Sequence, residues 1–174
     1  QNDGNTTIKN NTVGNIINAY TGNINATQTI GIYVNRGNNT IENNSVSNIK
    51  TYTKSSGSAS AASICGISVN RNTAGLNHTI KNNKIKGIYN LNPDARVDAY
   101  GIFFYGSNAD WSNLSGNLVQ NIEIQSSHIG SSVDGIVLYG GKAHFHNNII
   151  HLGKNFSNKC LIYGIWDQAT WTSD

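Results

Sequence analysis

Apolar and polar residues follow one another along this chain in a short pattern that occurs five times. Its fullest copy, TIENNSV at residues 40–46, places an Asn-Asn pair between two short apolar segments. A second pattern, Gly-Ile followed by alternating residues, begins at Gly31, Gly66, Gly101, Gly135 and Gly164. Repetition at such a spacing is typical of solenoids, in which each repeat buries its apolar face against its neighbours.

Alternation within each repeat predicts short strands. In the segment 31–34, Ile32 and Val34 share one face while Tyr33 points the other way. Three such strands separated by turns would form a hollow coil filled by Ile and Val, which predicts an all-β solenoid of about five coils. Two interior columns are expected: Ile32, Ile67, Ile102, Ile136 and Ile165, and Ile8, Ile41, Ile80, Leu114 and Phe145.

The Asn-Asn pair predicts a corner of the coil. Its first position is occupied by Asn10, Asn43, Asn82, Gly116 and Asn147. Because Asn and Gly best tolerate a left-handed backbone, we expect positive φ there. The second position is always Asn (Asn11, Asn44, Asn83, Asn117 and Asn148), which predicts a structural ladder of stacked amides.

The Gly-Ile patterns begin 35, 35, 34 and 29 residues apart, which is longer than such a coil needs. The surplus residues are expected in loops on one side of the stack, at 50–63, 89–99, after Ile122 and at 154–159. Variable loops beside a regular scaffold are a usual place for binding residues.

The segment GIYVNRGNNTIENNSV at residues 31–46 resembles the parallel β-helix repeat of pectate-lyase-like proteins, and the Asn-rich repeats of NosD-like surface proteins most of all. The resemblance extends over essentially the whole chain and implies a right-handed single-stranded parallel β-helix. Residues 1–174 are therefore expected to form a single β-helix segment of a longer solenoid protein. Since this fold carries lyases, hydrolases, adhesins and filament subunits, it implies no particular activity.

Composition and charge restrict the function. A net charge of +3 gives no support for nucleic-acid binding, and no apolar run is long enough for membrane insertion. Cys65 and Cys160 fall three coils apart, so they are expected to be independent thiols. His144 and His146 share an outward face, but no acid or cysteine completes a metal site, and no cofactor is expected.

An enzymatic function finds little support among only nine acidic residues. Asp98 and Asp134 fall on adjacent coils, but in different columns. The paired-Asp, Gly-His-Gly and Arg-x-Lys signatures of polygalacturonase-like β-helices are absent, so no catalytic residue is assigned.

Outward aromatic residues are the main candidates for binding. The expected outward columns are Tyr33, Ser68, Phe103, Val137 and Trp166, and Asn35, Asn70, Tyr105, Tyr139 and Gln168. Flat rings beside amides suit sugars, although a loop folded over this face would instead bury them. The candidate ligand-binding residues are Tyr33, Phe103, Tyr105, Tyr139 and Trp166, with Arg36 and Arg71 beside them.

The sequence thus favours a structural display β-helix of a secreted or cell-surface protein, with adhesion to a polysaccharide or glycan. The alternatives are a fragment of a polysaccharide lyase or glycoside hydrolase, and a stalk or filament subunit without a ligand. Uncapped ends would contact further coils or subunits.

Overall fold

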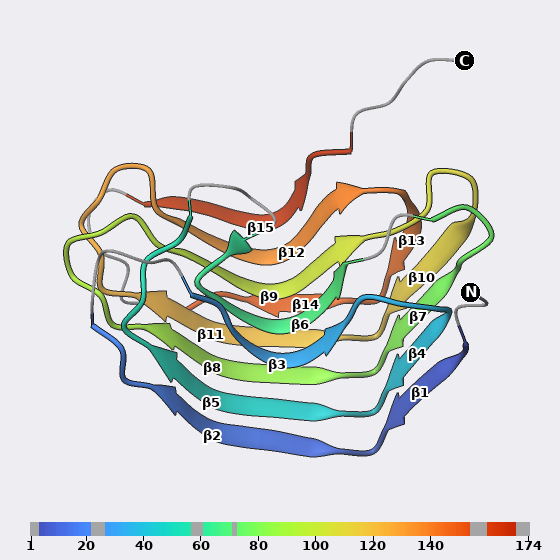
Figure 1. Cartoon of the computed structure of the whole chain (residues 1–174), viewed down its shortest axis with the longest axis horizontal. Helices are drawn as coiled ribbons and strands as arrows, with labels where there is room; N and C mark the ends of the chain where they lie inside the picture. Colours follow the sequence, from blue (N-terminus) through green and yellow to red (C-terminus); the bar gives the residue numbers. More distant parts are fainter. Residues whose placement is uncertain (1–3, 22–26, 57–60, 71–72, 154–159, 170–174) are drawn as a thin grey trace.

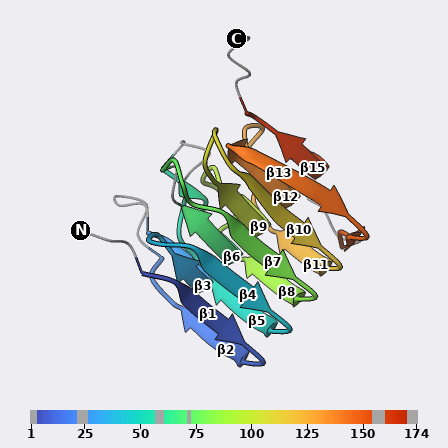
Figure 2. The same cartoon turned by 90° about the vertical axis from the view of Figure 1, so that its right-hand side faces the viewer.

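The structure, a computed structural model, describes residues 4–21, 27–56, 61–70, 73–153 and 160–169. Over these ranges the chain winds through three parallel sheets of five strands each, so that four complete turns connect the first coil to the last. Figures 1 and 2 show the coils stacked along one axis, with the first and last coils at opposite ends. The prediction of an all-β parallel β-helix is confirmed.

Each coil contributes one strand to sheet A, one to sheet B and one to sheet C. Sheet A contains β1 (Thr6–Lys9), β4 (Asn39–Glu42), β7 (His78–Lys81), β10 (Trp111–Ser115) and β13 (Lys142–His146). Sheet B contains β2 (Thr12–Asn18), β5 (Ser45–Thr51), β8 (Lys84–Asn90), β11 (Leu118–Ile124) and β14 (Ile149–His151). Sheet C contains β3 (Thr29–Val34), β6 (Ile64–Asn70), β9 (Asp98–Tyr105), β12 (Ser132–Gly140) and β15 (Leu161–Asp167).

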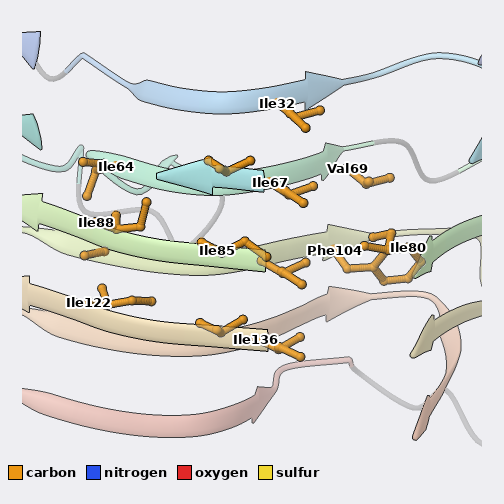
Figure 3. Packing of buried hydrophobic residues seen from close by; sticks show 14 of the residues in the cluster. Ile32, Ile64, Ile67, Val69, Ile80, Ile85, Ile88, Phe104, Ile122 and Ile136 are labelled. Carbon is orange, nitrogen blue, oxygen red and sulfur yellow. The ribbon is translucent and has the colours of Figure 1, made fainter. Parts of the chain in front are cut away.

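Both predicted interior columns are in register on neighbouring strands. Figure 3 shows Ile32, Ile67 and Ile136 one above another in the space between the sheets. Burial depends on position along the stack: Ile67 is 0% exposed, whereas Ile165 in the last described coil is 51% exposed. Only a coil with neighbours on both sides can bury its apolar residues completely.

The glycine of each Gly-Ile pair lies where the strand of sheet C bends. A Cβ atom on Gly66 would lie 2.6 Å from the carbonyl oxygen of Gly101 and 2.5 Å from Cγ2 of Ile85. The equivalent position on Gly101 would lie 2.5 Å from the oxygen of Gly135. No side chain fits at these positions, so the close stacking of sheet C requires glycine wherever another coil follows; at Gly164, in the last described coil, an added Cβ would meet no atom of the described residues within 4 Å.

The corner formed by the Asn-Asn pairs has the predicted conformation. The backbone angle φ is 56° at Asn43, 54° at Asn82 and 65° at Gly116. In the next column, Oδ1 of Asn83 accepts hydrogen bonds from the backbone N and from Nδ2 of Asn44, both at 3.0 Å. Similar bonds connect the other members, so the predicted amide ladder is confirmed.

Longer loops leave the stack between sheets B and C, on the left of Figure 1. They connect β5 with β6, β8 with β9 and β11 with β12, as the spacing of the repeats predicts. The predicted loop at 154–159 lies outside the described residues. Sheets B and C therefore both have the loops along one margin.

Candidate functional site

The outer face of sheet C carries a second apolar cluster, separate from the interior of the coils. Two positions of each repeat form it: the residue just before the glycine, such as Tyr100, and the residue two positions after the glycine, such as Phe103. Both point away from the interior of the coil. The buried members of this outer cluster are Ala62, Cys65, Tyr100, Phe103 and Val137. Ile30, Tyr105, Tyr139 and Trp166 pack against it and are partly exposed.

Two described residues of the segment between β5 and β6, Ser55 and Ala62, lie near this face. The backbone N of Ser55 donates to the carbonyl oxygen of Arg96 at 3.0 Å, and its Oγ accepts hydrogen bonds from the backbone N of Asp98 and Ser63 at 2.6 and 3.1 Å. Ala62, from the same segment, joins the outer cluster. Ala62 thus packs against part of the aromatic face, in the direction of the alternative that the sequence left open.

The predicted ligand-binding residues consequently have different environments. Phe103 is 2% exposed, whereas Tyr33 is 49% exposed and stands two coils away from it, beyond the buried Ser68. The three remaining aromatic candidates, Tyr105, Tyr139 and Trp166, are partly exposed. Of the two arginines, Arg36 is exposed and Arg71 lies outside the described residues.

The column predicted to contain Tyr105 and Tyr139 is wrong at Tyr139. β12 shifts its register between Leu138 and Gly140, so Gly140 is the residue opposite Tyr105. A Cβ atom on Gly140 would lie 2.7 Å from Cε2 of Tyr105, so glycine makes room for this ring. The two tyrosine rings still touch, edge to face, with centroids 5.2 Å apart, and Phe103 lies 5.6 Å from Tyr139.

A pair of buried carboxyl groups lies on the same face. Asp98 is 1% exposed and Asp134 is 0% exposed. The hydroxyl of Ser132 is 3.2 Å from Oδ1 of Asp98 and 2.8 Å from Oδ2 of Asp134. Arg96 lies on the far side, with Nε 3.6 Å from Oδ2 of Asp98. The columns of the two acids do differ, as the sequence indicates, but Ser132 bridges them.

This arrangement favours one proton held by the pair. A serine hydroxyl has a single hydrogen and can donate to only one of two ionised carboxylates. Burial is the largest effect raising the pKa of Asp134 to about 7; the Ser132 hydrogen bond opposes it and the charge of Asp98 adds to it. Burial also raises the pKa of Asp98, although the Arg96 charge acts against this effect. Asp134 is therefore the better proton carrier.

The thiol of Cys65 lies on this face as well, in the column that contains Tyr100. Burial raises its pKa to about 12, and Sγ donates to the carbonyl oxygen of Ile67 at 3.2 Å. A neutral, buried thiol is a poor nucleophile. Both cysteines are free, as predicted from their separation.

Ser132 is the member of this group that the sequence interpretation missed. A signal was present, because Asp98 and Ser132 both stand three residues before the glycine of their repeat and therefore share a column. Asp134 follows two residues after Ser132 on the same face. Repeat register could thus have placed the three side chains together, although not their burial.

On sheet A, His144 and His146 are exposed as predicted, and the ring of His144 stacks on Trp111 with centroids 4.4 Å apart. The described residues contain no group of three or more His, Cys, Asp or Glu side chains arranged to hold a metal ion. Nor does the described part of the chain include a helix of the length and apolarity that a membrane span requires.

A comparison with protein-family models gives no match, and neither the curated proteins nor the solved structures searched include a similar chain.

Proposed function

We propose that this β-helix is a display scaffold that binds carbohydrate at the outer face of sheet C. The observation that carries the proposal is the group of partly exposed rings on successive coils, Tyr105, Tyr139 and Trp166, at the margin of the buried outer cluster. Tyr163 extends it, with its ring stacked on Trp166 at 5.3 Å. Such rings offer flat apolar surfaces with polar edges, which suit the faces of sugars.

The rigid coil supports this function. Tyr139 is held between Phe103 and Tyr105, so little conformational freedom would be lost on binding. The resemblance to NosD-like and pectate-lyase-like repeats favours a secreted or cell-surface protein in which the β-helix presents this surface.

Replacement of Tyr105 and Tyr139 by Ala tests the proposal. We expect the double variant to lose binding to uncharged glycans on an array while it still unfolds cooperatively, because the interior columns are unchanged. Tyr20→Ala, which removes a 41% exposed tyrosine outside sheet C, is the matched control and should bind as the parent does. Unchanged binding by the double variant, or no glycan bound by the parent, would refute the proposal.

A second candidate function is hydrolysis or lyase cleavage of a polysaccharide, and the Asp98–Ser132–Asp134 group favours it. A neutral and an ionised carboxyl group are the pair that acid–base cleavage of glycosidic bonds needs. Both acids are buried, so the residues that cover them would have to move before a substrate could reach them. Release of reducing ends that is lost in Asp134→Asn and kept in Tyr20→Ala would select this function.

A third candidate, the stalk or filament subunit, rests on the last described coil. Ile162 and Ile165 are 46% and 51% exposed there, whereas their equivalents one coil earlier, Val133 and Ile136, are both 0% exposed. This exposed apolar end fits a further coil or subunit of the same geometry. Association in analytical ultracentrifugation that Ile165→Asp abolishes would support it.

A further inference from the structure

A second column of asparagine runs along the outside of sheet B. Asn15, Asn48, Gly87 and Asn121 occupy equivalent positions, since the residues on either side of each are paired in register. All four have positive φ, between 53° and 71°. Nδ2 of Asn48 donates to Oδ1 of Asn15 at 2.6 Å, so an outer amide ladder begins in the first two coils.

The ladder is interrupted at Gly87, which has no amide to continue it. The ring of Tyr89 lies beside the gap: a Cβ atom on Gly87 would be 3.1 Å from its Cε2 and 3.2 Å from its hydroxyl oxygen. The interruption leaves a hollow of about 270 Å³, lined by Ser47, Asn48, Lys86, Gly87 and Tyr89. This volume is close to the lower end of the roughly 300–1,000 Å³ range of small-molecule sites.

The charge around the hollow is mainly positive. Nζ of Lys50 lies 5.8 Å from the centroid of the Tyr89 ring. Lys84 and Lys86 are exposed on β8, and neither forms an ion pair within the described part of the chain. Glu123, opposite Tyr89 on the next strand, is the acidic residue of that column. An anion entering between Lys50 and Lys86 would meet more positive than negative charge.

We propose that this hollow binds one sugar ring that bears an anionic substituent, a sulfate or a carboxylate. The ring would lie against Tyr89, the anion would face Lys86 and Lys50, and the sugar hydroxyls would bond to Asn48 and Ser47 in place of the missing amide. The site goes beyond the proposed function, because it lies on sheet B and shares no residue with the aromatic face of sheet C.

Gly87→Asn is the most direct test. Asn already adopts positive φ at the equivalent positions 15, 48 and 121, so the variant should fold. Its side chain would shift the Tyr89 ring, which lies 3.1 Å from the position of the added Cβ, and would take up part of the hollow. Three ligands on one backbone are compared by titration calorimetry: cellohexaose, 6-O-sulfated cellohexaose and β-1,4-linked hexaglucuronate. We expect the parent to bind at least one of the two anionic ligands, and cellohexaose about tenfold or more weakly. Whether the sulfated or the uronate ligand binds shows which substituent the site takes.

Gly87→Asn and Lys86→Ala should each lower the affinity for the anionic ligand about tenfold or more. The affinity of the parent should fall as the salt concentration rises. Lys81→Ala, an exposed lysine of the same coil on sheet A, is the matched control and should change nothing. Equal binding of neutral and anionic ligands, parental affinity in Gly87→Asn and in Lys86→Ala, or no binding of either anionic ligand by the parent would overturn the proposal. In the Tyr105/Tyr139 double variant, the preference for an anionic ligand and the losses caused by Gly87→Asn and Lys86→Ala should persist, whatever the sheet C surface contributes in the parent, so the two sites can fail independently.

Discussion

Two asparagine columns run along this β-helix four residues apart, and they differ in burial and in hydrogen bonding. Asn44 and Asn83 of the corner column are 1% and 0% exposed, and each amide bonds to the coil on either side. Asn48 of the outer column is exposed, and the column is interrupted one coil later at Gly87. The same residue type at the same period thus stabilises the stack in one place and leaves a vacant position in the other.

Burial explains this difference. In the interior, an unpaired backbone N–H or amide loses its hydrogen bonds to water and finds no replacement, so a gap is costly. On the outside, water or a ligand can satisfy the groups next to a gap. An interruption is therefore tolerated only in the outer column, and there it can become a binding site.

The largest effect on the free energy of unfolding is expected from Asn83→Ala. This change leaves the backbone N of Asn44, the carbonyl oxygen of Ile41 and part of the amide of Asn117 without the partner that Asn83 supplies. We expect a loss on the order of 3–5 kcal/mol in the free energy of unfolding. Asn48→Ala in the outer column should cost less than about 0.5 kcal/mol. Similar losses in urea denaturation would show that the two columns do not differ as described.

An intermediate effect on the free energy of unfolding is expected from the buried carboxyl pair. One oxygen of Asp98 and one of Asp134 are buried without a hydrogen-bond partner among the described residues. Because the folded pKa of Asp134 is raised to about 7, the folded state binds its proton more tightly than the unfolded state does. Stability should therefore fall as the pH rises from about 4 to about 7, by on the order of a few kcal/mol. Asp134→Asn should remove much of this dependence and be more stable than the parent at pH 8. Parallel melting curves for parent and variant across this range would contradict the assignment.

The smallest of the three effects concerns the left-handed corner at Asn82, where φ is 54°. Asn82→Val should cost on the order of 1–3 kcal/mol, because a β-branched residue is strained at positive φ. Asn82→Gly should cost less, since Gly116 holds the equivalent position one coil later. Chemical denaturation measures both, and equal losses would show that the backbone angle is not what selects Asn here.

The periodic features of the fold were predictable from particular residues. The Gly-Ile pairs placed Ile67 and Ile102 in one buried column, and the alternation of Asn with Gly116 indicated positive φ. Such features depend only on the repeat, because equivalent residues of stacked coils are neighbours. The bulge at Tyr139 was not predictable, since it inserts one residue within a strand without changing the apolar pattern around it.

Residue type and period by themselves determined an all-β solenoid, its interior columns, its corner ladder and loops that leave on one side. The parallel β-helix was implied by the resemblance of the repeat. Only the tertiary structure decided which residues on the outer face of sheet C are buried and which are exposed. The segment before β6 belongs to no repeat that predicts where it packs, yet its Ala62 joins the outer cluster in which Phe103 is buried, while Tyr105 and Tyr139 remain partly exposed. The depth of an outward residue depends on what folds over it, and period alone contains no information about that.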